Sequence, residues 1–421
     1  MNKEAVQREK EKAIVYGLGK CWEQYAERLQ EDYEIIYCSD RDCKKSVNCL
    51  GFEFIMPANI SSKEYDVLIL CNYAFGMRED LMLQYDLKPD KMIYCLELYG
   101  KTKTTPEEKL AENLNKLTVI IPTYNRRLRL EKTLSLLKLQ TNPNFNVLIL
   151  DDNSNYSVDE IVGKQEPEFA SKIRVERNIG NLGLAGNTAT AFAKVEEGWV
   201  WTLADDDVPS IYAIELIHQE IEKTDGLGII LFSIWEMGKY MTDSHVEFND
   251  LDGMLLFYNN VMNEEKNNSV GGDFIFFSNK IYNMKYAKKY LKEVYSYLYT
   301  TIPQNMPILF GLDNKELKVR ISNKKIVSYS PPDGDHWSWL DNGLGMTILA
   351  DLPLHITKEI KKILYKLCMF DYHSVIRAAL IEDTKLAYEK LEKMYFRLYQ
   401  FFLSEEEKQE YLSKMHNLKA K

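Results

Sequence analysis

The chain has 421 residues, of which 45% are hydrophobic and 28% charged, values typical of an ordinary globular protein with two or three domains. Its net charge of -10 argues against a general nucleic-acid binder, because such proteins carry an excess of lysine and arginine. The longest apolar run, Leu227–Trp235, is too short to span a bilayer. Seven cysteines and a charged amino end without an apolar segment predict reduced thiols in a cytoplasm.

The first hundred residues alternate between short apolar segments and helical patterns. Four strands and two helices are expected, in the order strand Ala13–Gly17, helix Cys21–Leu29, strands Tyr33–Cys38 and Tyr65–Cys71, helix Met77–Tyr85 and strand Lys91–Leu96. Strands that alternate with helices predict a parallel sheet. This stretch resembles the small Rossmann-like domains fused to bacterial polysaccharide enzymes, so we expect an α/β domain over residues 1–103.

Two glycines, Gly17 and Gly19, follow the first expected strand, and Asp40 follows the second. A Gly-x-Gly turn with such an acid hints at a dinucleotide-binding fold. However, Trp22 stands where the third glycine of that fingerprint is expected. The glycines serve equally well in a tight turn between strand and helix, which is the interpretation we favour. An NAD(P)-dependent oxidoreductase working through this domain remains an alternative function.

A charged segment, Lys101–Asn115, separates this domain from a second one, which we expect over residues 116–355. Its first four strands are predicted at Leu117–Ile121, Asn146–Leu150, Lys172–Glu176 and Trp199–Leu203. Polar or acidic residues follow each of them, and the stretch Pro122–Arg126 is expected to terminate the first. In an open α/β sheet, ligands bind at the carboxyl ends of the strands. The sequence therefore predicts a ligand site built from these four loops.

Three acids, Asp205–Asp207, follow the last of these strands. Adjacent carboxylates repel one another unless a positive group lies among them, and a divalent metal that also binds phosphate oxygens is a usual solution. The alternative is an acidic turn that caps a helix at Ile211–Thr224. The loops upstream favour the metal site.

Four motifs at the ends of these strands are considered together: Val119–Arg126, Leu150–Ser154, Asn178–Asn187 and Asp205–Asp207. In order and spacing they resemble the motifs of family 2 glycosyltransferases of bacterial surface or capsular polysaccharide synthesis. The resemblance implies a GT-A fold, a nucleotide-diphosphate sugar donor that is most often UDP-linked, Mn or Mg as cofactor, and inversion at the anomeric carbon.

The resemblance also implies which residues bind the donor. These are Pro122, Tyr124, Arg126, Asp151, Asp152, Asn181, Gly183, Asn187, Asp205 and Asp206. Among them, Asp152 would accept hydrogen bonds from the base or ribose, and Arg126 would meet the diphosphate. Asp205 and Asp207 would hold the metal, which would neutralise the nucleotide leaving group, so that Asp207 belongs to the catalytic set.

The general base is less clear in this sequence. Many family members carry an acid later in the domain, but here the corresponding stretch reads Tyr299–Asn305 without one. Asp273 is the nearest candidate, although a structural turn explains it as well. His336 lies among acids and aromatics and is a suitable third metal ligand, with a surface role as the alternative. Trp337 is expected to stack on a sugar, and Trp339 to pack in the core.

Residues 356–421 show a helical pattern with an apolar stripe flanked by lysines. We expect these helices to pack on the catalytic domain or on a second copy of the chain, and contact with a membrane surface is a further option. The sequence thus predicts a cytoplasmic glycosyltransferase, working at the inner face of the cell membrane, that extends a glycan or lipid-linked acceptor. A non-catalytic sugar-nucleotide-binding scaffold is the third alternative.

Overall fold

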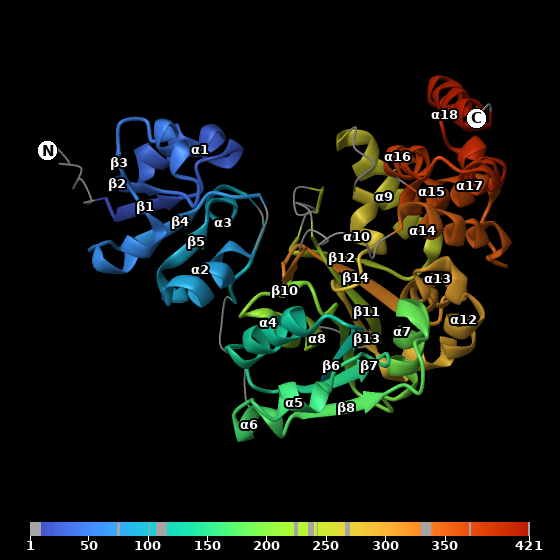
Figure 1. Ribbon diagram of the computed structural model, residues 1–421, viewed down its shortest axis with the longest axis horizontal. Coiled ribbons are helices and arrows are strands. Elements are labelled where there is room, and N and C mark those ends of the chain that lie inside the picture. The colour runs from blue at the N-terminus through green and yellow to red at the C-terminus, as the bar shows by residue number, and fades with distance from the viewer. Residues whose placement is uncertain are drawn as a thin grey trace, which may run out of the picture.

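The computed structural model describes residues 10–73, 76–100, 102–106, 116–222, 226–234, 240–241, 243–265, 270–329, 338–369 and 372–419 (Figure 1). These residues form two main sheets flanked by helices and a helical region at the carboxyl end. The predicted α/β class with C-terminal helices is therefore confirmed. No helix among the described residues has the length and apolar character needed to cross a bilayer. The charged segment Lys101–Asn115 lies mostly outside the described residues.

The amino-terminal domain is a parallel sheet with the strand order β3-β2-β1-β4-β5. Its elements are β1 (Lys12–Tyr16), α1 (Lys20–Asp32), β2 (Glu34–Ser39), β3 (Glu53–Ile55), β4 (Val67–Leu70), α2 (Met77–Tyr85), β5 (Met92–Tyr94) and α3 (Cys95–Tyr99). Strand β3 was not expected. The last strand is shorter than expected because a helix begins at Cys95, where the Glu97 carboxylate accepts the N–H of Tyr94 at 3.2 Å.

The second domain contains, in its described residues, an eight-stranded sheet with the order β12-β14-β11-β13-β9-β6-β7-β8. Only β12 and β13 run against the others. The strands are β6 (Leu117–Thr123), β7 (Asn146–Asp151), β8 (Ile173–Arg177), β9 (Trp199–Thr202), β11 (Leu227–Phe232), β12 (His245–Phe248), β13 (Lys280–Asn283) and β14 (Lys318–Ser322). A separate antiparallel pair joins β10 (Val208–Pro209) to β15 (Val327–Ser328).

Helices cover both faces of this sheet (Figure 1). They are α4 (Arg127–Lys138), α5 (Val158–Val162), α6 (Pro167–Ala170), α7 (Gly183–Ala193), α8 (Ala213–Ile221), α9 (Leu251–Glu265), α10 (Gly271–Ile275), α11 (Met284–Ala287), α12 (Leu291–Ser296) and α13 (Met306–Asp313). Because both faces are covered, β6, β7 and β9 consist almost entirely of buried residues, as the apolar runs of the sequence predict.

The first strand of this domain, which the sequence predicts to end at Ile121, is two residues longer in the structure. Strand β6 continues to Thr123, and Pro122 pairs with Leu150 of β7. On the other side of β6, pairing with β9 ends at Ile120. At Pro122, β6 no longer pairs with β9. The missing N–H of the proline therefore removes no hydrogen bond between these two strands, and the proline is tolerated.

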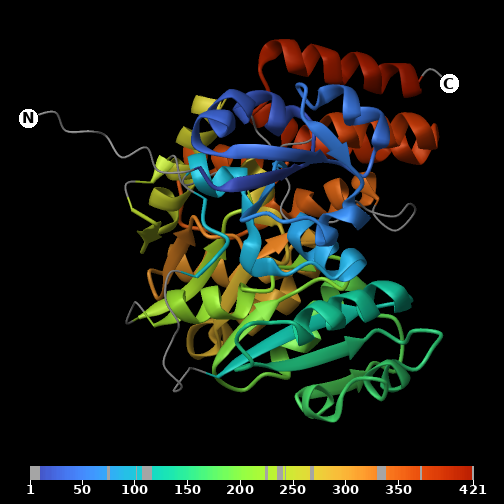
Figure 2. The ribbon, with the colours of Figure 1, turned by 90° about the vertical axis from the view of Figure 1, so that its left-hand side faces the viewer.

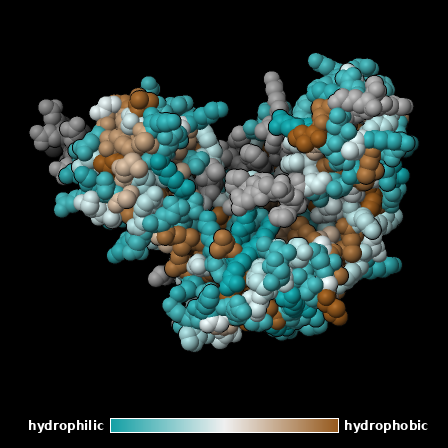
Figure 3. Space-filling view, viewed as in Figure 1, coloured by the Kyte–Doolittle hydropathy of each residue, from teal (hydrophilic) through white to brown (hydrophobic). Residues whose placement is uncertain are grey.

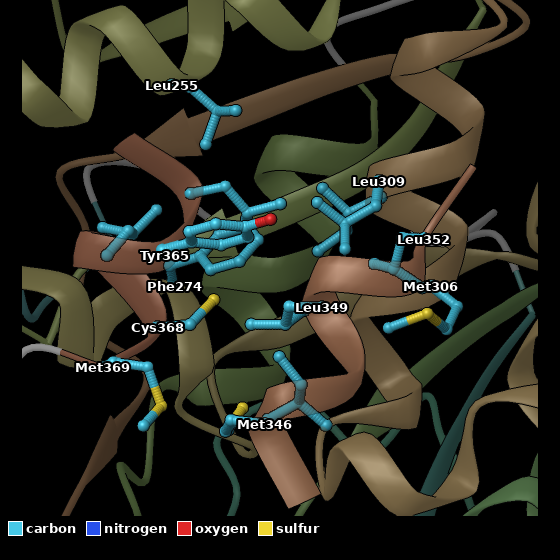
Figure 4. Close-up of a cluster of buried hydrophobic side chains, with 14 of the residues drawn as sticks. Leu255, Phe274, Met306, Leu309, Met346, Leu349, Leu352, Tyr365, Cys368 and Met369 are labelled. Carbon is cyan, nitrogen blue, oxygen red and sulfur yellow. The ribbon is translucent and has the colours of Figure 1, made fainter. Parts of the chain in front are cut away.

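The carboxyl-terminal helices share a core with the second domain. They are α14 (Trp339–Met346), α15 (Lys358–Cys368), α16 (Tyr372–Glu382), α17 (Lys385–Arg397) and α18 (Glu405–Lys419). Figure 4 shows Tyr365 and Cys368 of α15 beside Phe274 of α10, with Leu309 of α13 and Leu255 of α9 nearby. These five side chains are all buried. Of the arrangements expected from the sequence, the structure shows packing on the second domain.

A buried polar contact attaches the amino-terminal domain to the second domain. Glu79 of α2 accepts the N–H of Ile211 at 3.3 Å, and burial raises the pKa of the Glu79 carboxyl. Its neighbour Arg78 is fully buried between the rings of Tyr94 and Tyr212. Figure 2 shows the amino-terminal domain above the large sheet of the second domain, and in Figure 3 a notch separates its surface from that of the carboxyl-terminal helices. The contact at Ile211 lies four residues after Asp207.

Candidate functional site

Four adjacent strands bring the sequence motifs together at one edge of the large sheet. Strands β9, β6, β7 and β8 are parallel neighbours, so their carboxyl ends lie side by side. Direct hydrogen bonds join the loops that follow them: Thr123 Oγ1 donates to Asp205 Oδ2 at 2.7 Å, and the Asp152 N–H donates to the Thr123 carbonyl at 2.9 Å. The predicted edge site is therefore a connected group of loops.

Asp205 is the most buried of the three consecutive acids, and its neighbour Asp206 lies closest to positive charge. Asp205 Oδ1 accepts a bond from Arg126 Nη1 at 3.1 Å, and the same nitrogen contacts Asp206 Oδ2 at 2.6 Å. Arg129 also pairs with Asp206, at 3.0 Å. Burial raises the pKa of Asp205 to about 6, although the Thr123 hydroxyl and Arg126 act in the opposite direction. Arg126 and Arg129 thus provide positive charge next to Asp205 and Asp206, where the sequence alone predicts a metal ion.

Asp207 is held by the loop before β13, the strand that flanks β9 on the side away from β6. Its Oδ2 accepts a 2.5 Å bond from the hydroxyl of Ser278, which in turn accepts the N–H of Ala204 at 2.8 Å. Ser278 immediately precedes Asn279 and β13, the antiparallel neighbour of β9. Sequence analysis missed Ser278 because a single serine 71 residues from Asp207 carries no local signal.

The carboxylates offer hard oxygen ligands, which suit Mn²⁺ or Mg²⁺. Arg126 and a metal ion would compete for Asp205, because both oxygens of that carboxylate already accept bonds. Among the described residues, three Cys, His, Asp or Glu ligand atoms lie within 4.8 Å of one another only at Cys21, Cys71 and Cys95. A metal at the three acids would therefore take further ligands from the donor phosphates or from residues outside the described part of the chain. The predicted ligand His336 and the predicted stacking residue Trp337 lie there.

Asp151 and Asp152 have different roles in the structure. Asp151 is 1% exposed, and its two oxygens accept bonds from the Ser154 N–H and from Arg177 Nη1. Both oxygens of Asp151 are therefore engaged within the protein, as in a residue that positions the loop. Asp152 accepts bonds from Asn178 Nδ2 and the Leu182 N–H through Oδ1 alone. Its second oxygen accepts no hydrogen bond from the described residues, although the residue as a whole is only 2% exposed.

The glycine- and asparagine-rich loop lies over this carboxylate. Asn187 is 2% exposed and uses its amide inside the protein, with bonds to Asn178 and to the Leu150 carbonyl, so it fixes the loop and does not face a ligand. Asn181 is exposed and accepts the N–H of Gly183, which has φ +71°. A residue other than glycine would be strained at that position. Asn181 and Gly183 thus remain available at the surface of the loop.

The start of the first loop is also exposed. Tyr124 is 44% exposed, whereas Pro122 is buried beneath it. Asn125 follows with φ +54°, and its side chain and N–H both bond the neighbouring loop, at Asn155 and Ser154. Tyr124 is therefore presented on a fixed turn, in the position of a platform for a flat ring.

The structure does not favour Asp273 as the general base. This residue is 1% exposed, and its Oδ1 accepts the N–H of Ile234 at 2.6 Å. A base must reach the acceptor hydroxyl within hydrogen-bond distance. A buried carboxylate engaged by the backbone fits the alternative of a structural turn. The expectation that Trp339 packs in the core is also wrong, since it begins α14 and is 36% exposed.

Lys280, the first residue of β13, makes the stability of the fold depend on pH. Burial lowers the pKa of Lys280 to about 7, while the neighbouring Asp273 acts in the opposite direction. Between pH 7 and about 10 the unfolded chain therefore binds one more proton than the folded chain, so stability rises with pH by about 1.4 kcal/mol per unit. Compared with Lys280→Met, the wild type should gain about 2 kcal/mol in unfolding free energy between pH 7 and 9.

Urea unfolding at several pH values measures this gain. Lys280→Met adds a constant cost, because the carbonyl of Phe276 and the side chain of Asn279 lose their donor. The exposed Lys292 serves as control, and Lys292→Met should leave the wild-type slope unchanged. Parallel pH profiles for wild type and Lys280→Met would show that Lys280 is charged in the folded state.

The amino-terminal domain does not present a dinucleotide site of the expected kind. Asp40, the candidate ribose ligand, accepts the Leu18 N–H and Lys45 Nζ through Oδ2 and the Asp42 N–H through Oδ1. Trp22 is 1% exposed in the core. At Gly17, with φ +98°, a Cβ would lie 2.7 Å from the Cys71 carbonyl oxygen. The structure thus favours the tight-turn interpretation of the glycines.

A doubly covered α/β sheet with acidic loops at the carboxyl ends of its strands belongs to the class of α/β domains that bind ligands at that edge. Residues 118–291 match the family model described as Glycosyl transferase family 2, and residues 9–93 match one described as C2185-like, N-terminal. Residues 118–291 of the second domain are thus similar to glycosyl transferase family 2. The predicted resemblance to this family, with the GT-A fold that it implies, is confirmed over these residues.

Two curated relatives match parts of the chain. An uncharacterized glycosyltransferase of Haemophilus influenzae is 32% identical over 114 residues, which are 27% of this chain and 37% of that protein. A teichoic acid poly(glycerol phosphate) polymerase of Staphylococcus epidermidis is 28% identical over 147 residues, which are 35% of this chain and 19% of that protein. The chain thus spans less than two fifths of the length of either relative.

Solved structures with a similar backbone include S. aureus TarS 1-349 in complex with UDP-GlcNAc, at 16% identity and a TM-score of 0.49, covering 67% of this chain and 81% of that chain. Another is the mannosyltransferase PcManGT from Pyrobaculum calidifontis in complex with GDP-Man and Mn2+, at 14% identity and a TM-score of 0.40, covering 69% of this chain and 82% of that chain. The family assignment rests on the family model and not on these likenesses.

Proposed function

We propose that this protein is a metal-dependent glycosyltransferase that moves a sugar from a nucleotide-diphosphate donor, most often UDP-linked in this family, onto a glycan or lipid-linked acceptor of surface polysaccharide synthesis. The observation that carries the proposal is the meeting of Asp152 with Asp205–Asp207 at the carboxyl edge of β9, β6 and β7. In this orientation, one loop binds the base and ribose while the adjacent loop faces the diphosphate. The domain division at residues 1–103, 116–355 and 356–421 and the location at the inner face of the cell membrane belong to the same proposal.

The donor base would lie against Tyr124, with its N–H or hydroxyl donors directed to the free oxygen of Asp152. A carboxylate makes strong charge-assisted bonds with such donors. The loop carrying Asn181 and Gly183 would cover the ribose, because its backbone can approach a ligand closely. Asp152 Oδ1 fixes this loop through the Leu182 N–H, so base binding and loop position are coupled.

At the diphosphate, Arg126 and the acids Asp205 and Asp207 would act together. Asp205 and Asp207 would hold Mn or Mg, which supplies electrostatic stabilisation of the departing nucleotide. Arg126 lies 31% exposed beside them, and its guanidinium matches phosphate oxygens. The acceptor hydroxyl would attack the anomeric carbon from the side opposite the diphosphate, which gives inversion. None of the described residues is assigned as its base.

A thermal-shift panel tests the proposal. UDP, GDP, CMP, dTDP and NAD are each added with and without Mn, because a ligand that binds only the folded protein raises its melting temperature. The expected result is a large shift with one nucleoside diphosphate that requires Mn. A metal-independent shift with NAD alone would instead favour the oxidoreductase alternative and contradict the proposal.

A further inference from the structure

A cleft of about 480 Å³ lies between the amino-terminal domain and the family 2 domain. Its walls come from the loops after β1, β2 and β4, from the start of α2, and from Lys132, Val208, Ser328 and Tyr329 of the family 2 domain. This volume is in the range of pockets that hold one small organic ligand. Neither the transferase site nor the dinucleotide alternative accounts for a cavity shared by the two domains.

The topology of the small sheet places this cleft where a ligand is expected. In the strand order β3-β2-β1-β4-β5, the chain moves outward in one direction from β1 and in the other from β4. Open parallel sheets bind ligands outside the carboxyl ends of their strands at such a switch point. Gly17 after β1 and Cys71 after β4 both line the cleft, so the cavity and the switch point coincide.

The charges that line the cleft favour an anion. Four cationic side chains face two carboxylates, in a chain whose net charge is -10: Lys20, Arg41, Lys45 and Lys132 against Asp40 and Asp80. Asp80 pairs with Arg41 and with Lys132, each at 3.0 Å, and Asp40 pairs with Lys45 at 3.2 Å. Lys20 forms no ion pair with any described residue. The cleft therefore keeps an excess of positive charge.

The backbone at the floor of the cleft is open to close approach. Helix α1 begins after Gly19 without a side-chain cap, and Gly19, Lys20 and Cys21 at its start line the cleft. A Cβ at Gly19 would meet nothing within 4 Å, and φ there is -103°, which suits any residue. A side chain at position 19 would thus disturb no contact of the protein, but it would take space next to a ligand bound in the cleft.

We propose that this interdomain cleft binds a small phosphate-bearing ligand between Lys20, Gly19 and the family 2 domain. Phosphate oxygens match ammonium groups and free backbone N–H groups. The source is either a nucleotide or a phosphodiester of the acceptor glycan. Since Asp40 is engaged by the glycine turn, the ligand is not held through a ribose in the manner of a dinucleotide. The proposal goes beyond the transferase function, and only the phosphodiester source rests on the acceptor proposed there.

The position of the cleft gives such a ligand a route to the transferase site. Val208 lines the cleft and directly follows Asp207. Tyr329 also lines the cleft, and its pKa is raised mainly by burial and further by the charges of Asp207 and Asp206. An occupant that touches both walls would therefore hold the loop of the three acids against the amino-terminal domain.

Isothermal titration of the full chain with inorganic pyrophosphate, in EDTA, tests the proposal. Gly19→Asp adds a carboxylate in open space and Lys20→Glu reverses an unpaired charge, so each should weaken binding about ten-fold or more. Lys44→Glu is the matched control, because Lys44 is exposed beside Lys45 but does not line the cleft. Absence of pyrophosphate binding, or equal affinity in wild type, Gly19→Asp and Lys20→Glu, would overturn the proposal.

Competition distinguishes the two sources. Pyrophosphate bound to the wild type is displaced with UDP in one arm and with a glycerophosphodiester in the other. Gly19→Asp, treated in the same way, shows how much of the displaced pyrophosphate was bound outside the cleft. Displacement by UDP supports a nucleotide, and displacement by the diester supports a phosphodiester of the acceptor. Displacement by neither would mean an adventitious ion only and would refute the assignment. Melting temperatures of the ligand-free variants show that each is folded, and Lys20→Glu carries the test if Gly19→Asp is not.

Discussion

Asp207→Asn is expected to lower sugar transfer about 10³-fold, the cost of removing a principal electrostatic group from a transition state. Asparagine keeps the size of the side chain and can still accept the Ser278 hydroxyl through its amide oxygen. The fold should therefore persist while the negative charge that holds the metal is lost. The measurement is release of nucleoside diphosphate from the donor at saturating Mn, together with the melting temperature of the variant.

Asp159→Asn serves as the control for this substitution. Asp159 is an exposed acid in the first turn of α5, away from the three acids, so its variant should retain wild-type turnover. Near-normal turnover by Asp207→Asn would remove that residue from the catalytic set. Loss of turnover with an equally large loss of melting temperature would assign Asp207 a structural role.

Asp152→Asn should weaken binding of the donor nucleotide by about 10- to 100-fold, because one or two charge-assisted hydrogen bonds become neutral ones. The amide oxygen of asparagine can keep the bonds from Asn178 and Leu182 that fix the glycine-rich loop. The variant therefore separates ligand binding from loop anchoring. Calorimetric titration with the nucleoside diphosphate gives the affinity directly.

Asp152→Ala is the informative partner of this variant. It removes the loop anchors as well as the charge, so it should bind more weakly than Asp152→Asn. Wild-type affinity in Asp152→Asn combined with weak binding in Asp152→Ala would mean that Asp152 only anchors the loop. The base would then be bound elsewhere.

Much of the fold could be predicted because its signals are local. The run Trp199–Leu203 predicts a buried strand, and the strand observed there is β9. The acids after it fall at the sheet edge because neighbouring parallel strands end together. The end of β6 was predicted two residues too early. A strand excludes proline only where strands pair with it on both sides, and the pairing of β6 cannot be seen in its own sequence.

The division of labour within the site could not be predicted because it depends on contacts between distant segments. Asp151 and Asp152 are adjacent in sequence, yet Arg177 engages the first and leaves an oxygen of the second free. Likewise, Arg126 approaches Asp205 across 79 positions of the chain. A motif therefore predicts candidate residues for the site, while their individual hydrogen-bond partners decide which of them can meet a ligand.

The most direct test of the account is electron paramagnetic resonance of Mn²⁺ added to the protein, since bound and free ions give different signals. The account predicts that about one equivalent of Mn²⁺ binds when a nucleoside diphosphate is present, in wild type and not in Asp207→Asn. Mn²⁺ that stays free with every nucleotide, or that binds equally to wild type and Asp207→Asn, would contradict a metal-dependent transferase site at Asp205–Asp207.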